Sequence, residues 1–182
     1  ILPRISTRLQ GYLFFAAIAN LINNVGYLFE ITAPSEAVYV VALKFSYFGR
    51  IWVAFALLLV AVKISNVSYN DLITQILAFV HIATLCVMLT YEHHNLYYTT
   101  SRYVTDGIFP YIEYGHGIWY EVYNYALLSA YIVVGVACMC FDLTRERDVL
   151  KRKQLKILIS STAVQSVFFI LSILISSPLV AL

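Results

Sequence analysis

The sequence predicts an all-α transmembrane helical bundle of five spans, with a small β-hairpin between the third span and the fourth. Two observations carry this prediction. Of the 182 residues, 61% are hydrophobic and only 12% are charged, with a mean hydropathy of +0.78, whereas soluble domains average about 45–50% apolar and about 25% charged residues. Five stretches are also long enough to cross a hydrocarbon core, which takes about 20 apolar residues as a helix. None of them shows the alternation of a membrane-spanning β-strand.

The expected spans follow one another along a single domain, residues 1–182. They are Gly11–Ile31, Glu36–Val62, Leu72–Thr90, Ile118–Phe141 and Leu155–Ser176. The first connection is tight, and we expect Ser35 at the N-cap of the second helix, followed by Glu36, whose negative charge favours the helix dipole.

The connection between the third span and the fourth, residues 95–117, differs from the others. It alternates bulky and polar residues on both sides of Asp106-Gly107, a pair typical of hairpin turns. Pro110 would confine the second strand to a sheet edge. We therefore expect an extracellular hairpin that acts as a lid over the outer face of the bundle.

Basic residues gather on one side of the membrane when five spans alternate in direction. They are Arg4, Arg8, Lys63 and the six residues Arg145, Arg147, Lys151, Arg152, Lys153 and Lys156. Because lysine and arginine accumulate on the cytoplasmic side, we expect a multi-pass protein of the inner (plasma) membrane, with residue 1 cytoplasmic and residue 182 extracellular or periplasmic. The chain starts without methionine, so we expect a further helix at each end, with a natural five-span protein as the alternative.

The sequence gives no sign of a metal site, a cofactor or a catalytic centre. The three cysteines lie inside apolar stretches, as thiols that serve packing do. His93 and His94 point about 100° apart on a helix, and His81 lies about 20 Å from His94 along the same axis, which disfavours a shared metal. No nucleophile–base pair, phosphate loop or nucleic-acid-binding motif is present. We therefore expect no metal, cofactor, catalytic residue or nucleic-acid partner.

The first span carries a row of polar side chains inside the membrane. The row is formed by Asn20, Asn23, Asn24, Tyr27 and Glu30. Since amides exposed to lipid are costly, we expect this face to meet protein or an internal cavity. Interhelical hydrogen bonding alone is one explanation of the asparagines, and a contribution to a ligand site is the other.

The second span carries two cations, and ionisable groups in a membrane are rare and are retained for function. Arg50 needs an acidic partner, for which Glu30 is nearest in depth. Lys44 can pair with Glu36 or with Glu92. A structural ion pair and a role in ligand binding are both compatible with this pattern.

Residues Thr90–Tyr98, named the rim segment here, end the third span with polar and aromatic groups at the edge of the membrane. We expect the rim segment to line a ligand cavity, with His94 as its main contact. In the fourth span, Trp119 fits an interfacial aromatic belt, but Tyr123 lies deeper. We expect Tyr123 to face the bundle interior, near the His93–His94 end of the third span.

Four motifs, in order along the chain, resemble the seven-transmembrane N-terminal sensor region of bacterial histidine kinases, which also occurs ahead of diguanylate cyclases. They are Tyr27-Leu-Phe-Glu30, Lys44-Phe-Ser-Tyr47-Phe-Gly49, the set Thr90, His94 and Leu96, and the set Gly115, Trp119 and Tyr123. A basic loop, residues 145–156, precedes the last span as in that family. The resemblance implies that this chain holds the second to sixth spans of the module.

Together these features predict a receptor module that binds a small-molecule or lipid ligand in the outer half of the bundle. Its helix movement would act on a cytoplasmic kinase or cyclase output, and the family implies a homodimer through the full-length protein. The expected ligand-binding residues are Glu30, Lys44, Arg50, His94, Trp119 and Tyr123. A small-molecule transporter and a structural membrane subunit are the alternatives, although the inverted repeats of many transporters are not seen.

Overall fold

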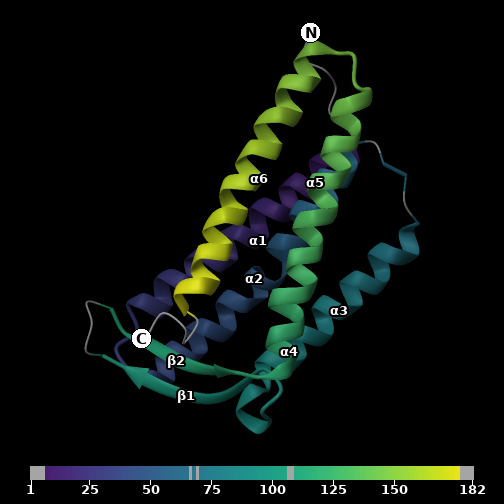
Figure 1. The fold of residues 1–182 in the computed structure, drawn as a ribbon. Coiled ribbons are helices and arrows are strands. Elements are labelled where there is room, and N and C mark those ends of the chain that lie inside the picture. The colour runs from purple at the N-terminus through teal and green to yellow at the C-terminus, as the bar shows by residue number, and fades with distance from the viewer. Residues whose placement is uncertain (1–6, 66, 69, 106–108, 177–182) are drawn as a thin grey trace.

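The computed structural model describes residues 7–65, 67–68, 70–105 and 109–176, most of them in helices. The elements in chain order are α1 (Thr7–Ile31), α2 (Glu36–Ile64), α3 (Asp71–Leu89), the 3₁₀-helix η1 (Tyr91–His93), β1 (Tyr98–Val104), β2 (Tyr111–His116), α4 (Ile118–Glu121), the π-helix η2 (Val122–Leu127), α5 (Leu128–Arg145) and α6 (Val149–Ser176). In Figure 1, α5 and α6 run side by side, and the hairpin lies across the end of the bundle where α4 begins.

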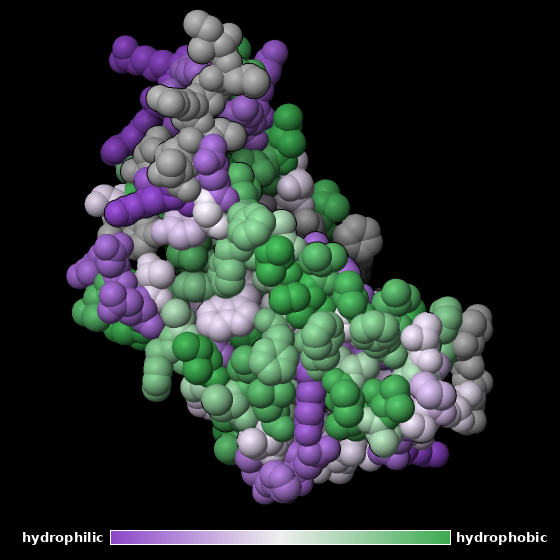
Figure 2. Space-filling model, turned by 180° about the vertical axis from the view of Figure 1, so that it is seen from behind, coloured by the Kyte–Doolittle hydropathy of each residue, from purple (hydrophilic) through white to green (hydrophobic). Residues whose placement is uncertain are grey.

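Four helical stretches are long and apolar enough to cross a membrane, and they coincide with the first four predicted spans. They are Arg8–Ile31, Glu36–Ile64, Asp71–Leu89 and Ile118–Arg145. Helix α6 covers the fifth predicted span, Leu155–Ser176, but does not meet the same criteria within the described part of the chain. The count of five therefore stays a prediction. Figure 2 shows hydrophobic side chains over the middle of the molecule and hydrophilic ones towards its two ends, as a membrane protein requires.

Helix α2 is the central element of the bundle. Half of the residues in its most apolar stretch are buried, whereas 11–17% are buried in the corresponding stretches of the other three candidate spans. Helix α2 packs against α1, α3 and α5. Its contact with α1 is unusually close, because a Cβ atom at Gly49 would lie 2.2 Å from the Ala19 carbonyl oxygen, and one at Gly26 would lie 2.4 Å from Ser46 Cα. These two glycines let the helix backbones approach.

The predicted hairpin exists and is formed by β1 and β2. The strands are antiparallel, with Arg102 opposite Glu113 and Tyr103 opposite Ile112. Pro110 comes just before β2 rather than within it, so it removes no hydrogen bond from the ladder. The Asp106-Gly107 turn lies outside the described residues, and the extracellular position of the hairpin stays a prediction.

The connection between α5 and α6 is held by one lysine between two carboxylates. Lys151 Nζ lies 2.6 Å from Glu146 Oε2 and 2.9 Å from Asp142 Oδ2. The backbone N–H groups of Arg147 and Asp148 donate to the other oxygen of Glu146. The hydrogen bond from Lys151, together with these backbone donors, lowers the pKa of the Glu146 carboxyl to about 2. Figure 1 places this connection at the opposite end of the bundle from the hairpin.

We expect Gly49→Ala to destabilise the protein and Gly11→Ala to be neutral or stabilising. A methyl group at Gly49 meets the backbone of α1, whereas one at Gly11 meets nothing within 4 Å. Overpacking costs about 1–3 kcal/mol, while alanine in place of an unconstrained helical glycine gains up to about 1 kcal/mol. Thermal unfolding in detergent micelles measures both. Equal effects of the two substitutions would contradict the close α1–α2 contact.

We expect acid to loosen the connection between α5 and α6. Because the pKa of Glu146 is lowered from 4.5 to about 2 in the folded protein, its contribution to stability is present above pH 4.5 and is lost as the pH falls towards 2. NMR titration of the Glu146 side-chain carboxyl measures this pKa. Lys151→Met should raise it towards 4.5, and an unchanged value would show that the lysine is not its main cause.

Candidate functional site

The charge centre between α1 and α2 joins Glu30 to Arg50, the pair expected from the sequence. Glu30 is 3% exposed, and Arg50 Nη2 donates to its Oε1 over 3.1 Å, while Arg50 Nε donates to Asn23 Oδ1 over 3.1 Å. The Ser46 hydroxyl donates to the same carboxylate oxygen of Glu30. The guanidinium also lies over the Tyr47 ring, 4.8 Å from its centroid. The buried carboxylate thus accepts from two side chains, the Arg50 cation and the Ser46 hydroxyl.

Only part of the polar row on α1 takes part in this centre. Asn23 is half-buried and Glu30 is buried, but Asn20, Asn24 and Tyr27 are exposed. The expectation that the whole row faces protein or a cavity is therefore wrong for this chain. At about 100° per residue, Asn20, Asn24 and Tyr27 lie about a quarter turn away from the side of α1 that contacts α2.

At the rim of the bundle, Lys44 pairs with Glu92, one of its two expected partners. Lys44 Nζ lies 2.6 Å from Glu92 Oε2 and 5.6 Å from the centroid of the Tyr91 ring. The side chains of Lys44 and Glu92 are 26% and 45% exposed, so water screens this pair more than it screens the pair of Glu30 and Arg50. The ion pair ties α2 to η1.

His94 is occupied within the rim segment itself. Its Nδ1 accepts from the backbone N–H of Leu96 over 3.3 Å, and its Nε2 lies 3.0 Å from Thr90 Oγ1. Since the Thr90 hydroxyl donates to the Cys86 carbonyl, the proton of the imidazole is on Nε2 and points to Thr90. The main local effect of His94 is to fix the turn that follows α3.

Tyrosines attach the hairpin to the helices. Tyr98 of β1 stacks on Tyr114 of β2 with 3.9 Å between ring centroids, and its hydroxyl lies 2.7 Å from that of Tyr47 on α2. Tyr103 donates to the carbonyl of Ala33, in the connection between α1 and α2, over 3.3 Å. Burial raises the pKa of the Tyr98 and Tyr114 hydroxyls, so both keep their protons. The hairpin is therefore docked on the bundle.

A second polar centre lies deeper, around the fully buried His81 of α3. Tyr123 donates to the Ile51 carbonyl over 3.1 Å, and its hydroxyl lies 2.7 Å from His81 Nδ1. Because a hydroxyl has one proton, Tyr123 accepts from Nδ1–H, and Nε2 accepts from Tyr131, 2.9 Å away. Trp52 stacks on the imidazole at 5.5 Å. Both ring nitrogens of His81 are satisfied.

The expectation that Tyr123 approaches His93 and His94 is wrong, because Tyr123 contacts His81 instead. Tyr123 belongs to η2, a π-helical turn, where the backbone holds an extra residue per turn and changes which side chains face inward. Just before it, Trp119 donates from its indole nitrogen to Thr84 Oγ1 over 3.1 Å. The start of the fourth span is thereby fixed to α3.

A pocket of about 270 Å³ opens beside the rim segment, between the start of α2, η1 and β1. Its lining residues are mostly polar. They are Glu36, Val40, Tyr91, Glu92, Asn95, Tyr98, Thr99, Thr100 and Ser101. This hollow is named the rim pocket here. Four residues of the rim segment, Tyr91, Glu92, Asn95 and Tyr98, line this pocket, but His94, the expected main contact, does not. Ligand binding there stays a prediction.

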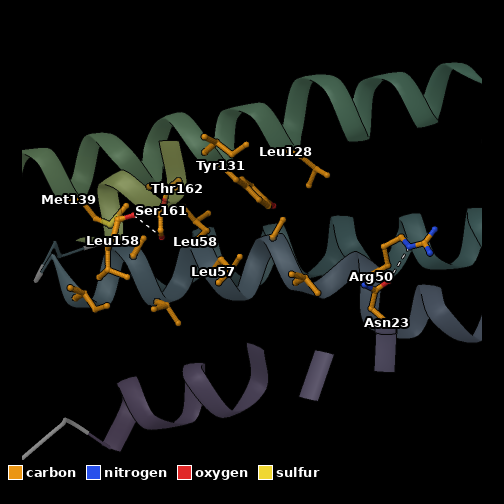
Figure 3. Close-up of a pocket in the computed structure, with 17 residues that line it drawn as sticks. Asn23, Arg50, Leu57, Leu58, Leu128, Tyr131, Met139, Leu158, Ser161 and Thr162 are labelled. Carbon is orange, nitrogen blue, oxygen red and sulfur yellow. Dashed lines mark hydrogen bonds between the residues drawn. The ribbon is translucent and has the colours of Figure 1, made fainter. Parts of the chain in front are cut away.

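A larger cavity of about 440 Å³ lies deeper, between α2, α5 and α6. Figure 3 shows its mainly apolar walls, with Leu57, Leu128 and Met139 along its length and Asn23 and Arg50 at one end. The two hollows share no lining residue. Two residues of the charge centre, Asn23 and Arg50, line the larger cavity, and none lines the rim pocket.

A family model described as the N-terminal 7TM region of histidine kinase matches residues 1–182. The chain belongs to this family. The family resemblance is thereby confirmed, and the chain is part of a multi-pass membrane region that is distinct from the catalytic part of a histidine kinase. Comparisons with curated proteins and with solved structures found no match.

The six residues expected to bind ligand in this 7TM region lie in four local groups rather than one. Glu30 and Arg50 form the charge centre, Lys44 and His94 lie at the rim, Trp119 binds α3, and Tyr123 belongs to the His81 centre. The sequence interpretation did not single out Tyr131 or the hydroxyls of Thr99, Thr100 and Ser101. The alternation along β1 was the available signal for the hydroxyls, and a tyrosine inside an apolar span was the signal for Tyr131.

We expect Glu30→Gln to destabilise the 7TM region by about 1.5–3 kcal/mol, because it removes the charge from the hydrogen bonds of a buried carboxylate, while the Arg50 side chain, 36% exposed, keeps some hydration. Glu92→Gln, which breaks the exposed pair with Lys44, should cost less than about 1 kcal/mol. Unfolding in mixed micelles compares the two. The double substitution Glu30→Leu with Arg50→Met should recover most of the lost stability, and additive losses would contradict a direct coupling.

We expect Tyr123→Phe to lower the free energy of unfolding by about 1–3 kcal/mol, since it leaves His81 Nδ1–H without an acceptor in a buried site. Tyr125→Phe is the matched control in the same π-helical turn, because Tyr125 is exposed. The same unfolding measurement applies. If both variants behave alike, the His81 centre contributes nothing specific to stability.

Proposed function

We propose that this chain is the receptor part of a bacterial signalling protein that binds a ligand in the outer half of the bundle. The ligand would move the helices and so act on a cytoplasmic kinase or diguanylate cyclase output. Five spans, a hairpin on the outer side and a homodimer formed through the full-length protein belong to this proposal. The family match supports the signalling role, and the basic connections at the opposite end from the hairpin support the orientation.

The rim pocket is the observation that carries the proposal. It is formed by the start of α2 together with η1 and β1, which follow α2 only after the whole of α3. A molecule bound there touches the central helix and the docked hairpin at once. A ligand changes an equilibrium between two conformations only by binding one of them better, and a pocket between separate elements changes shape whenever these elements move.

The expected site residues keep distinct roles in this proposal. Lys44 and His94 shape the rim beside the ligand. Glu30 and Arg50 couple α2 to α1, and Trp119 and Tyr123 couple the fourth span to α3 and α2. Motion of α2 at the rim would then reach the other helices through hydrogen bonds and ion pairs that are already formed.

A pocket-filling variant tests the proposal. We expect a small-molecule screen by thermal shift, with the protein in lipid nanodiscs, to find compounds that stabilise the parent but not Ser101→Trp. Ser101 lines the pocket, whereas Thr105→Trp, the matched control beyond the end of β1, should respond as the parent does. Compounds that act equally on both variants bind elsewhere and contradict the site.

The relay is tested on the same samples. Spin labels at Lys63 and Lys153, near the far ends of the α2 and α5–α6 segments, should change their separation when an active compound is added. A compound that binds in the rim pocket without changing this distance would contradict the relay while leaving the binding site intact.

A further inference from the structure

We propose that the rim pocket recognises a small organic amine, and that Lys44 is its internal competitor. This inference rests on the proposed receptor function and names the ligand class of the same pocket. Its basis is the chemistry of the lining residues together with the position of the Lys44 ammonium group at the edge of the pocket.

The lining of the rim pocket offers acceptors and negative charge. Glu36 and Glu92 supply two carboxylates, Asn95 supplies an amide, and Thr99, Thr100 and Ser101 supply hydroxyls, while no lysine or arginine lines this pocket in the described structure. Arg102, which follows Ser101 on β1, is exposed and is not among the residues that line the pocket. An anionic ligand would meet two like charges here, whereas a cationic ligand meets opposite ones.

The Lys44 ammonium group shows how an amine fits beside this pocket. It lies 2.6 Å from Glu92 Oε2 and 5.6 Å from the centre of the Tyr91 ring, a carboxylate and an aromatic face being the two partners that an alkylammonium ion prefers. Its pair is half-exposed, and such pairs are weak enough to exchange. A ligand ammonium can therefore take over Glu92 while the Lys44 side chain moves into water.

Glu36 gives the pocket a second anchor. It is exposed in the first turn of α2, and no ion pair of Glu36 is found among the described residues. Once Lys44 has moved into water, Glu36 and Glu92 leave two negative charges at the rim pocket. An organic monoamine neutralises one of them, and a small diamine neutralises both. The volume of about 270 Å³ is just below the range of about 300–1,000 Å³ that is usual for drug-sized ligands, so the amine is a small one.

Isothermal titration calorimetry on the protein in lipid nanodiscs tests the ligand class with simple probes. We expect n-butylamine and putrescine to bind, and 1-butanol and butyrate, which have a neutral and an anionic head, not to bind. Calcium chloride is titrated separately. Binding of butanol or butyrate in the rim pocket would overturn the amine inference but leave the receptor proposal intact, as would calcium binding without amine binding. If no compound from the thermal-shift screen binds in the rim pocket, the receptor proposal itself is overturned.

Two variants are expected to change amine affinity in opposite directions. Lys44→Met removes the competitor and should tighten putrescine binding by about two- to fivefold, while Lys63→Met, at the far end of the same helix, should not change it. Glu92→Gln should weaken putrescine binding by at least about tenfold, while Glu113→Gln on β2 should not. Weaker or unchanged binding in Lys44→Met overturns the competition, and unchanged binding in Glu92→Gln overturns the site.

Circular dichroism and thermal unfolding confirm that each variant is folded. If Glu92→Gln does not fold, Glu36→Gln replaces it, with the same expected direction, because Glu36 lines the pocket without taking part in an ion pair with Lys44. Unchanged affinity in that variant would overturn the role of the second carboxylate.

Discussion

The ion pair of Glu30 with Arg50 is the interaction on which the arrangement of the other helices depends. A carboxylate that is 3% exposed needs compensation, and its partners Arg50 and Ser46 are both on α2. The pair therefore holds α1 and α2 in contact. Gly26 and Gly49 make that contact possible, because a side chain at either position would separate the helices by meeting the backbone of the other one.

The position of α2 follows from this pair and gives the helix its connecting role. Arg50 binds α1, and the next residue, Ile51, accepts the hydrogen bond of Tyr123 in η2. Two turns earlier, Lys44 binds Glu92 at the rim. One rigid helix thus touches the charge centre, the His81 centre and the rim pocket in sequence. Coupling between sites is carried by packed elements that have alternative arrangements, and a π-helical turn beside such a helix is a place where the register can change.

The sequence was sufficient for features that follow from the cost of exposing charge or from local periodicity. The partner of Arg50 was predictable, because a cation at mid-depth requires an anion nearby. Lys44 had two possible partners, and in the structure the 3₁₀ turn of η1 places Glu92 beside it. The hairpin was predictable from alternation and its turn residues. The four apolar helices were predictable from composition and length.

The His81 centre could not be predicted from the sequence, for a physical reason. His81 is a single polar residue within an apolar helix, and its two partners come from segments 42 and 50 residues away. Tyr123 was expected at the wrong height because the start of the fourth span was placed beside the His93–His94 end of the third, whereas Trp119 already binds Thr84, further down α3. The six expected residues fall into four groups because spacing along the sequence indicates how deep a residue lies in the membrane. It does not indicate which faces of two helices meet.

A ligand can act at a polar centre only where its groups can exchange their hydrogen-bond or ion-pair partners. At His81 both ring nitrogens and the Tyr123 hydroxyl already have partners, so a ligand there would have to break a buried network and leave its members unsatisfied, which is costly. The charge centre is similar, since Glu30 is held by Arg50 and Ser46. At the rim, the Lys44–Glu92 pair is half-exposed, so exchanging one partner for a ligand costs little. Binding energy can therefore be used at the rim to move α2, while the two inner centres keep their bonds and transmit the movement.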